Sequence, residues 1–315
     1  MANATPAARR AADSAPILLI LSAASFGLTW VAAPWATAEI PPLVVACVRF
    51  AIAAVLLFGW CRWRGIPIPL RRADLPVVIG VTATSVVIYN LLFLYGVGLA
   101  PASHGAVIVP GLIPIFTLGL SRVLFGEHVA WPRVVGAVVA LAGLALVVGP
   151  AFAGGQEIAG DLMFAAGAAA WATYAIFSRL ATQRMHAAAI TFLSSALGSL
   201  AFAVLTLVLQ PGGFGALGTA SAQALAGVVY LGTFGTVFSF VLFALGVEQI
   251  GPARASAYAV LIPLFGVGAT VTILGETIEP VALLGAALVI VGLRLMQSRA
   301  EPPPSSAGGA VPAGQ

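Results

Sequence analysis

The chain has 315 residues, of which 61% are hydrophobic and 8% are charged, and its formal net charge is +4. Soluble domains carry about 25% charged residues, so this composition excludes a water-soluble globule. A positive net charge would also suit a nucleic-acid partner, but the positions of the basic residues, given below, exclude that class as well.

Ten mostly apolar segments follow one another along the chain, separated by short connectors with Pro, Gly or charged residues. A helix needs about 20 such residues to cross a bilayer, and the apolar runs lack the alternation of a membrane β-barrel. We therefore predict an all-α membrane protein with ten transmembrane helices. The predicted spans are residues 16–37, 42–61, 75–97, 102–124, 132–149, 160–180, 187–209, 221–246, 253–274 and 280–297.

The basic residues predict the orientation of these spans. All fourteen are arginines, and with a cytoplasmic N-terminus thirteen of them fall on the inner side, which is what the positive-inside rule requires. Residues 1–15 are then a cytoplasmic N-terminal segment. Residues 298–315, which are of low complexity, are a disordered cytoplasmic tail. The protein is expected in a bacterial inner membrane as a multi-pass protein with both termini in the cytoplasm.

The chain also carries an internal repeat, with matching residues 149 positions apart. Each half, residues 16–149 and residues 160–297, holds five predicted spans, so the halves enter the membrane from opposite sides. Inverted repeats are a common construction of secondary transporters, which rock one half against the other around a site near the midplane. The alternative is a duplication that produced only a large membrane scaffold. The pairs are Pro114 with Pro263, Gly119 with Gly268, Gly126-Glu127 with Gly275-Glu276, Gly136 with Gly285, and Gly143 with Gly292.

Several loose motifs in a specific order carry a family resemblance. They are Phe26 to Trp30, Val48-Arg49-Phe50, Pro110 to Pro114, both Gly-Glu turns and the glycine-rich fifth and tenth spans. With these motifs the chain resembles the EamA family of the drug/metabolite transporter superfamily. The resemblance implies ten helices, a central cavity, and export or exchange of amino acids or similar small metabolites.

Arg49 is the first candidate binding residue, because a charge inside a span is costly and suggests function. Its guanidinium could bind a substrate carboxylate through two hydrogen bonds. The alternative is a structural arginine that reaches the interface or ties down backbone carbonyls. Asn90 poses the same choice, because a buried amide binds either the substrate or a neighbouring helix.

Other polar and aromatic residues of the spans form a candidate cavity lining. Prolines inside helices free backbone groups, which are tolerated at membrane depth beside a cavity, so three of them are candidate cavity walls or, alternatively, packing kinks. The candidate lining is Ser25, Thr29, Trp30, Tyr89, Trp171, Tyr174, Ser178, Thr236, Ser239 and Tyr258, and the helix breaks are Pro110, Pro114 and Pro263.

Three further features have narrower interpretations. His104, near the outer start of the fourth span, is a candidate proton site. Glu127 and Glu276 are expected to cap the helices that follow them. The paired glycines of the fifth and tenth spans predict close helix packing, within one chain or in a homodimer.

Catalytic signatures are absent from the sequence: it has no Walker loop, no Gly-x-Ser-x-Gly turn, no His-Glu-x-x-His and no cluster of metal ligands. We therefore expect no enzyme activity, cofactor or metal, although a buried Asp–His pair would reopen that question. No Asp or Glu lies deep in a predicted span, which disfavours cationic substrates. We predict a carrier in contact with membrane lipid that exports or exchanges a small neutral or zwitterionic metabolite, with an amino acid as the leading candidate. The alternatives are uptake of another metabolite, and a membrane sensor or scaffold that transports nothing.

Overall fold

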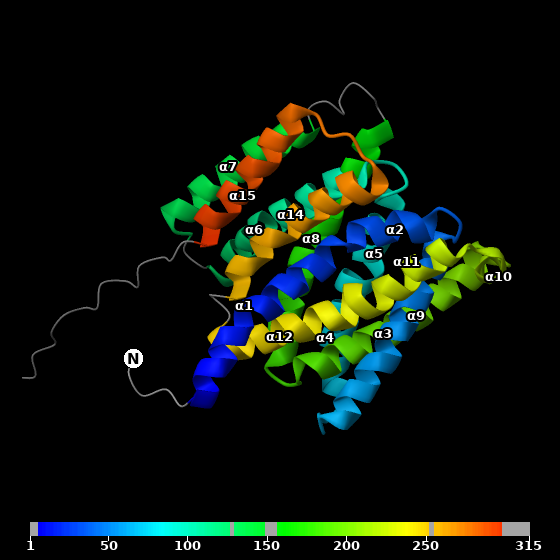
Figure 1. Cartoon of the computed structure of the whole chain (residues 1–315). Helices are drawn as coiled ribbons and strands as arrows, with labels where there is room; N and C mark the ends of the chain where they lie inside the picture. Colours follow the sequence, from blue (N-terminus) through cyan, green and yellow to red (C-terminus); the bar gives the residue numbers. More distant parts are fainter. Residues whose placement is uncertain (1–5, 127–128, 149–155, 252–254, 298–315) are drawn as a thin grey trace, which may run out of the picture.

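The computed structural model describes residues 6–126, 129–148, 156–251 and 255–297, and in these ranges every regular element is a helix (Figure 1). Helix α1 begins at Pro6, within the segment predicted as an N-terminal extension. The predicted tail at residues 298–315 and Glu127 lie outside the described residues. The elements before residue 150 are α1 Pro6–Gly27, α2 Thr29–Thr37, α3 Pro42–Trp63, η1 Arg72–Asp74, α4 Leu75–Val81, η2 Thr82–Ile88, α5 Tyr89–Gly96, α6 Ala102–Phe125 and α7 Trp131–Val148.

The later elements repeat this alternation of long helices and short connectors. A single long helix, α8, covers the predicted sixth span. These elements are α8 Gln156–Thr182, α9 Ala187–Leu209, η4 Gly213–Gly215, α10 Ala216–Thr219, α11 Ala222–Gly232, η5 Thr233–Phe238, α12 Ser239–Ile250, η6 Ser256–Val260, α14 Leu261–Ala269, η7 Thr270–Leu274 and α15 Pro280–Gln297.

Among the described residues, seven continuous helical stretches are long and apolar enough to cross a membrane, and two shorter apolar helices, residues 131–147 and 258–274, accompany them. The protein is therefore a multi-pass membrane protein with an all-helical fold. The count of ten spans stays a prediction. The seven stretches are Ser14–Thr37, Pro42–Trp63, Arg72–Gly96, Ala102–Phe125, Ala187–Leu209, Ala222–Ile250 and Pro280–Gln297.

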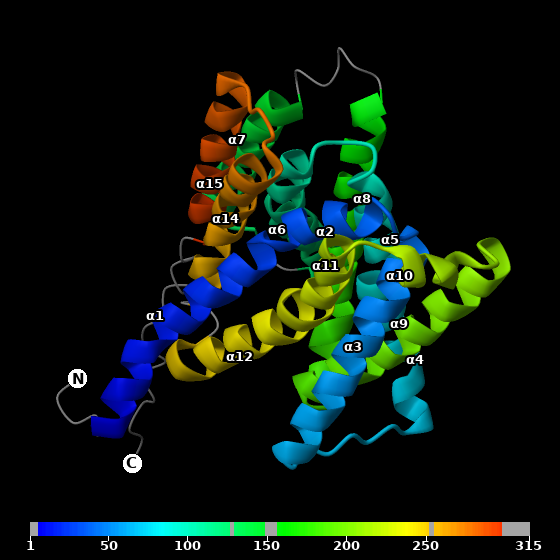
Figure 2. The same cartoon turned by 45° about the vertical axis from the view of Figure 1, so that its right-hand side comes forward.

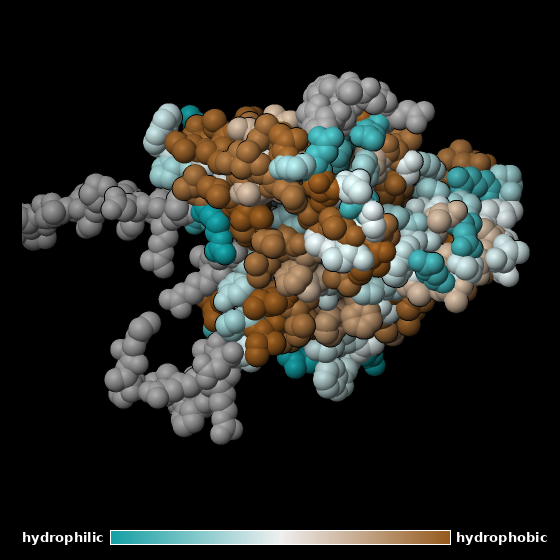
Figure 3. All heavy atoms as spheres, turned by 45° about the horizontal axis from the view of Figure 1, so that its top comes forward, coloured by the Kyte–Doolittle hydropathy of each residue, from teal (hydrophilic) through white to brown (hydrophobic). Residues whose placement is uncertain are grey.

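Large apolar side chains cover much of the outer surface. Val123 and Val208, for example, are 80% and 70% exposed, and Figure 3 shows broad hydrophobic areas, with polar residues between them, on the face that it presents. In water this surface would be unfavourable, whereas lipid tails solvate it well. The surface is therefore suited to contact with lipid.

Helices α7 and α15 pack along each other at one side of the molecule, as both cartoon views show (Figures 1 and 2). Glycines make this contact close. A Cβ atom at Gly143 would lie 2.5 Å from the carbonyl oxygen of Gly285, and one at Gly136 would lie 2.6 Å from that of Gly292. The predicted glycine packing therefore occurs within one chain. Elsewhere, α3 packs along α9 and α6 along α8.

Three membrane-length stretches are interrupted at their middle. The first bends between α1 and α2, where Gly27 allows close approach: a Cβ atom there would lie 2.6 Å from the Cβ of Phe265. The other two contain π-helical turns, η2 between α4 and α5, and η5 between α11 and α12. Because π-turns disturb regular backbone bonding and often mark functional sites, these breaks indicate where a site lies.

Candidate functional site

A cavity of about 390 Å³ lies at the level of these breaks. Both halves of the chain contribute to its wall, which combines residues of α1, α2, α3, α4, η2, α5, α6, α8, α9, η5, α12, η6, α14 and α15. The volume lies within the usual range for small-molecule sites. The polar and charged residues of the wall are Ser22, Thr29, Arg49, Ser85, Tyr89, Asn90, Trp171, Tyr174, Thr191, Ser194, Ser195, Thr236, Tyr258 and Gln297.

Arg49 is the charged residue of this wall within the described chain, and it is 6% exposed. Its Nη1 donates to Oδ1 of Asn90 at 2.9 Å, and its Nη2 donates to Oγ1 of Thr236 at 3.1 Å. The guanidinium carbon lies 4.9 Å from the ring centre of Phe50. Its hydrogen-bond partners are thus neutral side chains, and not the backbone carbonyls that the alternative, structural interpretation of Arg49 named.

Both partners of Arg49 lie at or next to the π-helical breaks. Asn90 is the second residue of α5, just after η2, and its amide nitrogen donates to the carbonyl oxygens of Ser85 and Val86 in η2 at 3.0 and 2.9 Å. Thr236 lies in η5, and its hydroxyl donates to the carbonyl oxygen of Leu231, near the end of α11, at 2.8 Å. Each side chain thus donates to the backbone in or just before a break and also accepts from Arg49. The two breaks therefore position the guanidinium.

Aromatic rings form much of the remaining wall. The ring centre of Trp171 lies 4.8 Å from that of Tyr89, 5.1 Å from that of Tyr174 and 6.4 Å from that of Phe240. Phe240 in turn meets Phe26 edge to face at 5.4 Å. The cavity thus combines one buried cation with an apolar surface that includes several aromatic rings.

Most of the residues predicted as cavity lining are in the wall, and some are not. Pro110 and Pro114 both line it, so their position agrees with the cavity interpretation. The predicted residues in the wall are Thr29, Arg49, Tyr89, Asn90, Trp171, Tyr174, Thr236 and Tyr258. Those outside it are Ser25, Trp30, His104, Ser178, Ser239 and Pro263.

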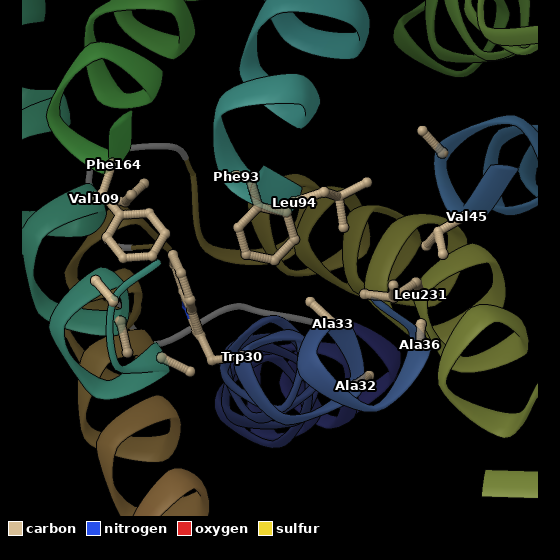
Figure 4. Close-up of a cluster of buried hydrophobic side chains, with 14 of the residues drawn as sticks. Trp30, Ala32, Ala33, Ala36, Val45, Phe93, Leu94, Val109, Phe164 and Leu231 are labelled. Carbon is tan, nitrogen blue, oxygen red and sulfur yellow. The ribbon is translucent and has the colours of Figure 1, made fainter. Parts of the chain in front are cut away.

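Trp30 lies beyond the cavity, in the packed core, and is 3% exposed. Its ring meets Phe93 at 4.9 Å and Phe164 at 5.4 Å between ring centres, both edge to face (Figure 4). Gly105 makes room for it, because a Cβ atom there would overlap the indole ring. Trp30 therefore packs behind Phe93, which lines the cavity, and is not itself part of the wall.

The serines outside the wall are hydrogen-bonded, and two of them bond a residue within it, Ser178 to Tyr174 and Ser239 to Ser22. Ser178 hydrogen-bonds Tyr174, the carbonyl oxygen of Ser239 accepts from Ser22 Oγ at 2.8 Å, and Ser239 Oγ donates to Phe234 O at 2.5 Å. The carbonyl oxygen of Ser25 accepts from the hydroxyl of Tyr230 at 3.2 Å.

Pro263 is buried in α14 and is not one of the residues that line the cavity. A proline removes the backbone bond to the preceding turn, and the residues before it form the 3-10 turn η6. Tyr258 and Ile262, which precede Pro263, line the cavity. Pro263 therefore shapes the wall without belonging to it.

His104 is paired with an acid at one end of the molecule. Its Nδ1 lies 3.1 Å from Oδ1 of Asp161, and the two side chains are 16% and 5% exposed. This is the kind of buried pair that would reopen the question of an enzyme. However, neither residue lines the cavity around Arg49, so the pair lies outside that site.

Carboxylates tie together connectors at this same end. Glu276 accepts from the backbone N–H groups of Ala102 and Ser103 at 2.9 and 3.0 Å, so it caps α6. The prediction that it caps the helix after it was wrong. Glu39 accepts from the backbone N–H and the hydroxyl of Ser221 at 2.7 and 2.6 Å. The hydroxyl bond, with the backbone bond second, lowers the pKa of the Glu39 carboxyl.

Sequence reasoning missed several hydroxyl groups of the wall. Ser22 lies on α1, Ser85 on η2, and Thr191, Ser194 and Ser195 lie on α9. The adjacent pair Ser194-Ser195 in the middle of an apolar segment was an available signal. A helical serine can satisfy itself on its own backbone, as Ser85 does on Val81 O at 2.8 Å, so a serine alone does not indicate a cavity.

Comparison with known proteins adds a family. The family of EamA-like transporters matches residues 13–149 and 158–297. A protein of Streptantibioticus cattleyicolor named as a probable terminal-alkyne amino-acid exporter is 29% identical over 82% of this chain and 82% of its own length. The inner membrane transporter YedA of Escherichia coli K12, itself called uncharacterized, is 26% identical over 81% of each chain. A solved crystal structure with 19% identity shares the fold, with a TM-score of 0.66 over 90% of this chain and 97% of the other.

Proposed function

Because the chain belongs to the family of EamA-like transporters, we propose that it is a secondary transporter that exports an amino acid or a close derivative by alternating access. The observation that carries this proposal is Arg49, a buried guanidinium in the cavity wall with neutral partners. A carboxylate is the natural counter-charge for such a group, because a planar guanidinium binds it with two parallel hydrogen bonds.

The proposal includes ten spans in two inverted repeats of five. The helices that correspond under the 149-residue offset pack against each other, α7 against α15, through glycines that are themselves paired in the sequence. Arg49 in the first half meets Thr236 in the second. A site between halves is the arrangement that rocking carriers use.

Alternating access is supported by the one-sided position of the cavity. It runs from Thr29 at the start of α2 back along α1 to Leu19, and on α15 it reaches Gln297, whereas beyond Trp30 the helices are packed. With the predicted topology, this arrangement is open toward the cytoplasm and sealed on the outside, as an exporter loading its substrate would be. The relative named as an inner membrane transporter supports the same membrane for this chain.

The amino-acid assignment draws on the relative named as an amino-acid exporter and on the cavity, which offers a carboxylate-binding group and an apolar wall. Uptake of another small metabolite is the alternative within transport. The wall leaves that choice open, because an alternating carrier can run in either direction.

Flux through reconstituted vesicles tests the proposal. Wild-type protein, Arg49→Ala and Asn90→Ala are compared with Arg62→Ala, which removes an exposed arginine from the same helix. We expect saturable flux of labelled amino acids or their derivatives for wild type and Arg62→Ala, and its loss in Arg49→Ala and Asn90→Ala variants that still elute as folded monodisperse protein. If well-folded wild-type protein carried no member of the panel, the exporter would be excluded and a membrane sensor or scaffold would be favoured.

A further inference from the structure

The charges around the cavity do not balance. Among the described residues that line it, Arg49 carries a formal charge and no Asp or Glu is present. The buried carboxylates elsewhere in the described chain, Asp74 and Asp161, are engaged with Arg184 and His104 at other places. The wall therefore carries one uncompensated positive charge.

Arg49 is also short of hydrogen-bond partners. A guanidinium has five N–H donors, and that of Arg49 donates to the side chains of Asn90 and Thr236. Its Nε is buried and has no acceptor. Buried charges are normally paired, because an isolated ion in a medium of low dielectric constant is strongly disfavoured. An anion in the cavity would supply the missing counter-charge.

A positively charged group in the same cavity would find much weaker partners. The hydroxyls of Thr29, Ser85 and Thr236 already donate to backbone carbonyls and can offer an ammonium group only a neutral oxygen. The rings of Trp171 and Tyr89 offer π faces. Neither kind of group cancels a full charge as a carboxylate does.

The net charge of the loaded cavity follows from these counts. A zwitterion leaves the +1 of Arg49 uncompensated overall, whereas a monoanion brings the sum to zero. The aromatic wall formed by Phe26, Trp171, Tyr174 and Phe240 is suited to an apolar body attached to that anion.

We propose that the site selects apolar monocarboxylates without a free ammonium group, such as N-acylated amino acids or amine-free carboxylic acids, over the corresponding free amino acids. This rests on the proposed function and narrows it. Arg49 binds the carboxylate, Asn90 and Thr236 hold Arg49, and the aromatic wall takes the apolar body.

A matched ligand series on the full-length protein in detergent tests the preference. The series is L-leucine, N-acetyl-L-leucine, 4-methylpentanoate and L-leucinamide, which differ in charge around one apolar body. Binding is measured by thermal stabilisation and by inhibition of flux in vesicles, in a buffer of low chloride because chloride itself can neutralise Arg49. We expect the two monoanions to act at concentrations at least about tenfold lower than L-leucine, since one uncompensated charge is easily worth a factor of ten, and L-leucinamide to be inactive.

The ranking is read on wild-type protein, so it needs no variant that folds. L-leucine binding as well as or better than N-acetyl-L-leucine would overturn the proposed preference while leaving an Arg49 carboxylate site in place. If none of the carboxylates binds or is carried, the proposed function itself fails. The variant Arg49→Gln is expected to abolish the difference between monoanion and zwitterion, and Arg49→Lys, which keeps the charge but not the planar fork, to retain it at lower affinity. If folded Arg49→Gln still bound monoanions more tightly than zwitterions, a group other than Arg49 would be responsible for the preference.

Discussion

Arg49 on α3 and Thr236 on η5 lie 187 residues apart in the chain, yet Nη2 of the first donates to Oγ1 of the second at 3.1 Å. Thr236 completes its own bonding by donating to Leu231 O, so it accepts from Arg49 and donates to the backbone at once. The bond joins the charge of the first half to the irregular turn of the second. Thr236 is therefore a positioning residue for the guanidinium.

Replacing Thr236 with Val removes this acceptor and keeps the shape of the side chain. Hydrogen bonds to charged groups contribute about 1.5–3 kcal/mol, so we expect the apparent affinity for transported carboxylates to fall about tenfold or more. Thr236→Ser keeps the hydroxyl and is expected to stay near wild type. The comparison is made by concentration-dependent flux, and equal affinity of the Val and Ser variants would show that Arg49 does not need this partner.

Trp30 is expected to seal the cavity, because its ring lies between Phe93 and Phe164 against Gly105. Trp30→Ala should open a path from the outside. The measurement is the rate at which a membrane-impermeant maleimide labels Ile113→Cys in the cavity wall of intact cells, in a background with Cys47 and Cys61 replaced. We expect faster labelling than with Trp30 in place. Trp63→Ala, which removes a 74% exposed tryptophan, is the control, and equal labelling rates in all three proteins would exclude Trp30 as the seal.

Glu276 is expected to stabilise the contact between the connector before α15 and the start of α6. Glu276→Gln removes the negative charge at a helix N-terminus and leaves only one oxygen for the two N–H groups of Ala102 and Ser103. Loss of a cap costs about 0.5–2 kcal/mol, so the melting temperature should fall. Glu279→Gln makes the same chemical change at an exposed position nearby and should have little effect. If both variants lowered the melting temperature by a similar amount, the cause would be the change in net charge and not the loss of the cap.

The residues predicted best from sequence are those whose presence in a bilayer is costly. Arg49 and Asn90 were singled out for that reason, and they are hydrogen-bonded to each other in the cavity wall at 2.9 Å. Ser194 and Ser195 carry no such cost, because helical hydroxyls can bond to their own backbone, and they were missed. A side chain that is strongly disfavoured in a bilayer must have a partner, which makes it recognisable in the sequence. A serine that bonds its own backbone is tolerated facing lipid, core or cavity, so its sequence position does not tell these apart.

The positions of Trp30 and Glu276 show a different limit. An indole in a span suits either a cavity or a core, and here the deciding feature is Gly105, 75 residues further along the chain, which leaves space for the ring. Glu276 was expected to cap the helix after it, but it reaches the N-terminus of α6 instead. Both outcomes depend on which helices become neighbours, and local sequence contains no information on that.

His104 stays our candidate for the proton site, in its pair with Asp161 at 3.1 Å. The charged groups around it are Asp161 and Glu157 on α8 and Glu276 before α15. His104 is next to Gly105, which leaves space for the Trp30 ring, and Asp161 lies one turn before Phe164, which contacts that ring. We therefore expect protonation of the pair to affect the packing of Trp30. We expect His104→Gln to keep substrate exchange at equal pH and to lose accumulation driven by a pH gradient. Gradient-driven accumulation at the wild-type level would exclude His104, whereas loss of exchange as well would indicate damage to the fold, to be checked by elution and melting.

The α7–α15 contact is expected to be a determinant of stability and not of substrate binding. Gly143→Ala would place a methyl group 2.5 Å from Gly285 O and 2.7 Å from Val289 N. Both are backbone atoms, which cannot rotate away as a side chain can, so the two helices have to separate. Overpacking of this kind costs about 1–3 kcal/mol. We expect a lower melting temperature in detergent, with the ranking of carboxylate ligands unchanged, because neither Gly143 nor Gly285 lines the cavity.

Gly119→Ala is the matched control, since a methyl group at this helical position meets no other atom within 4 Å and alanine favours the helix. If Gly143→Ala melted no lower than Gly119→Ala, close glycine packing would not be what holds α7 against α15.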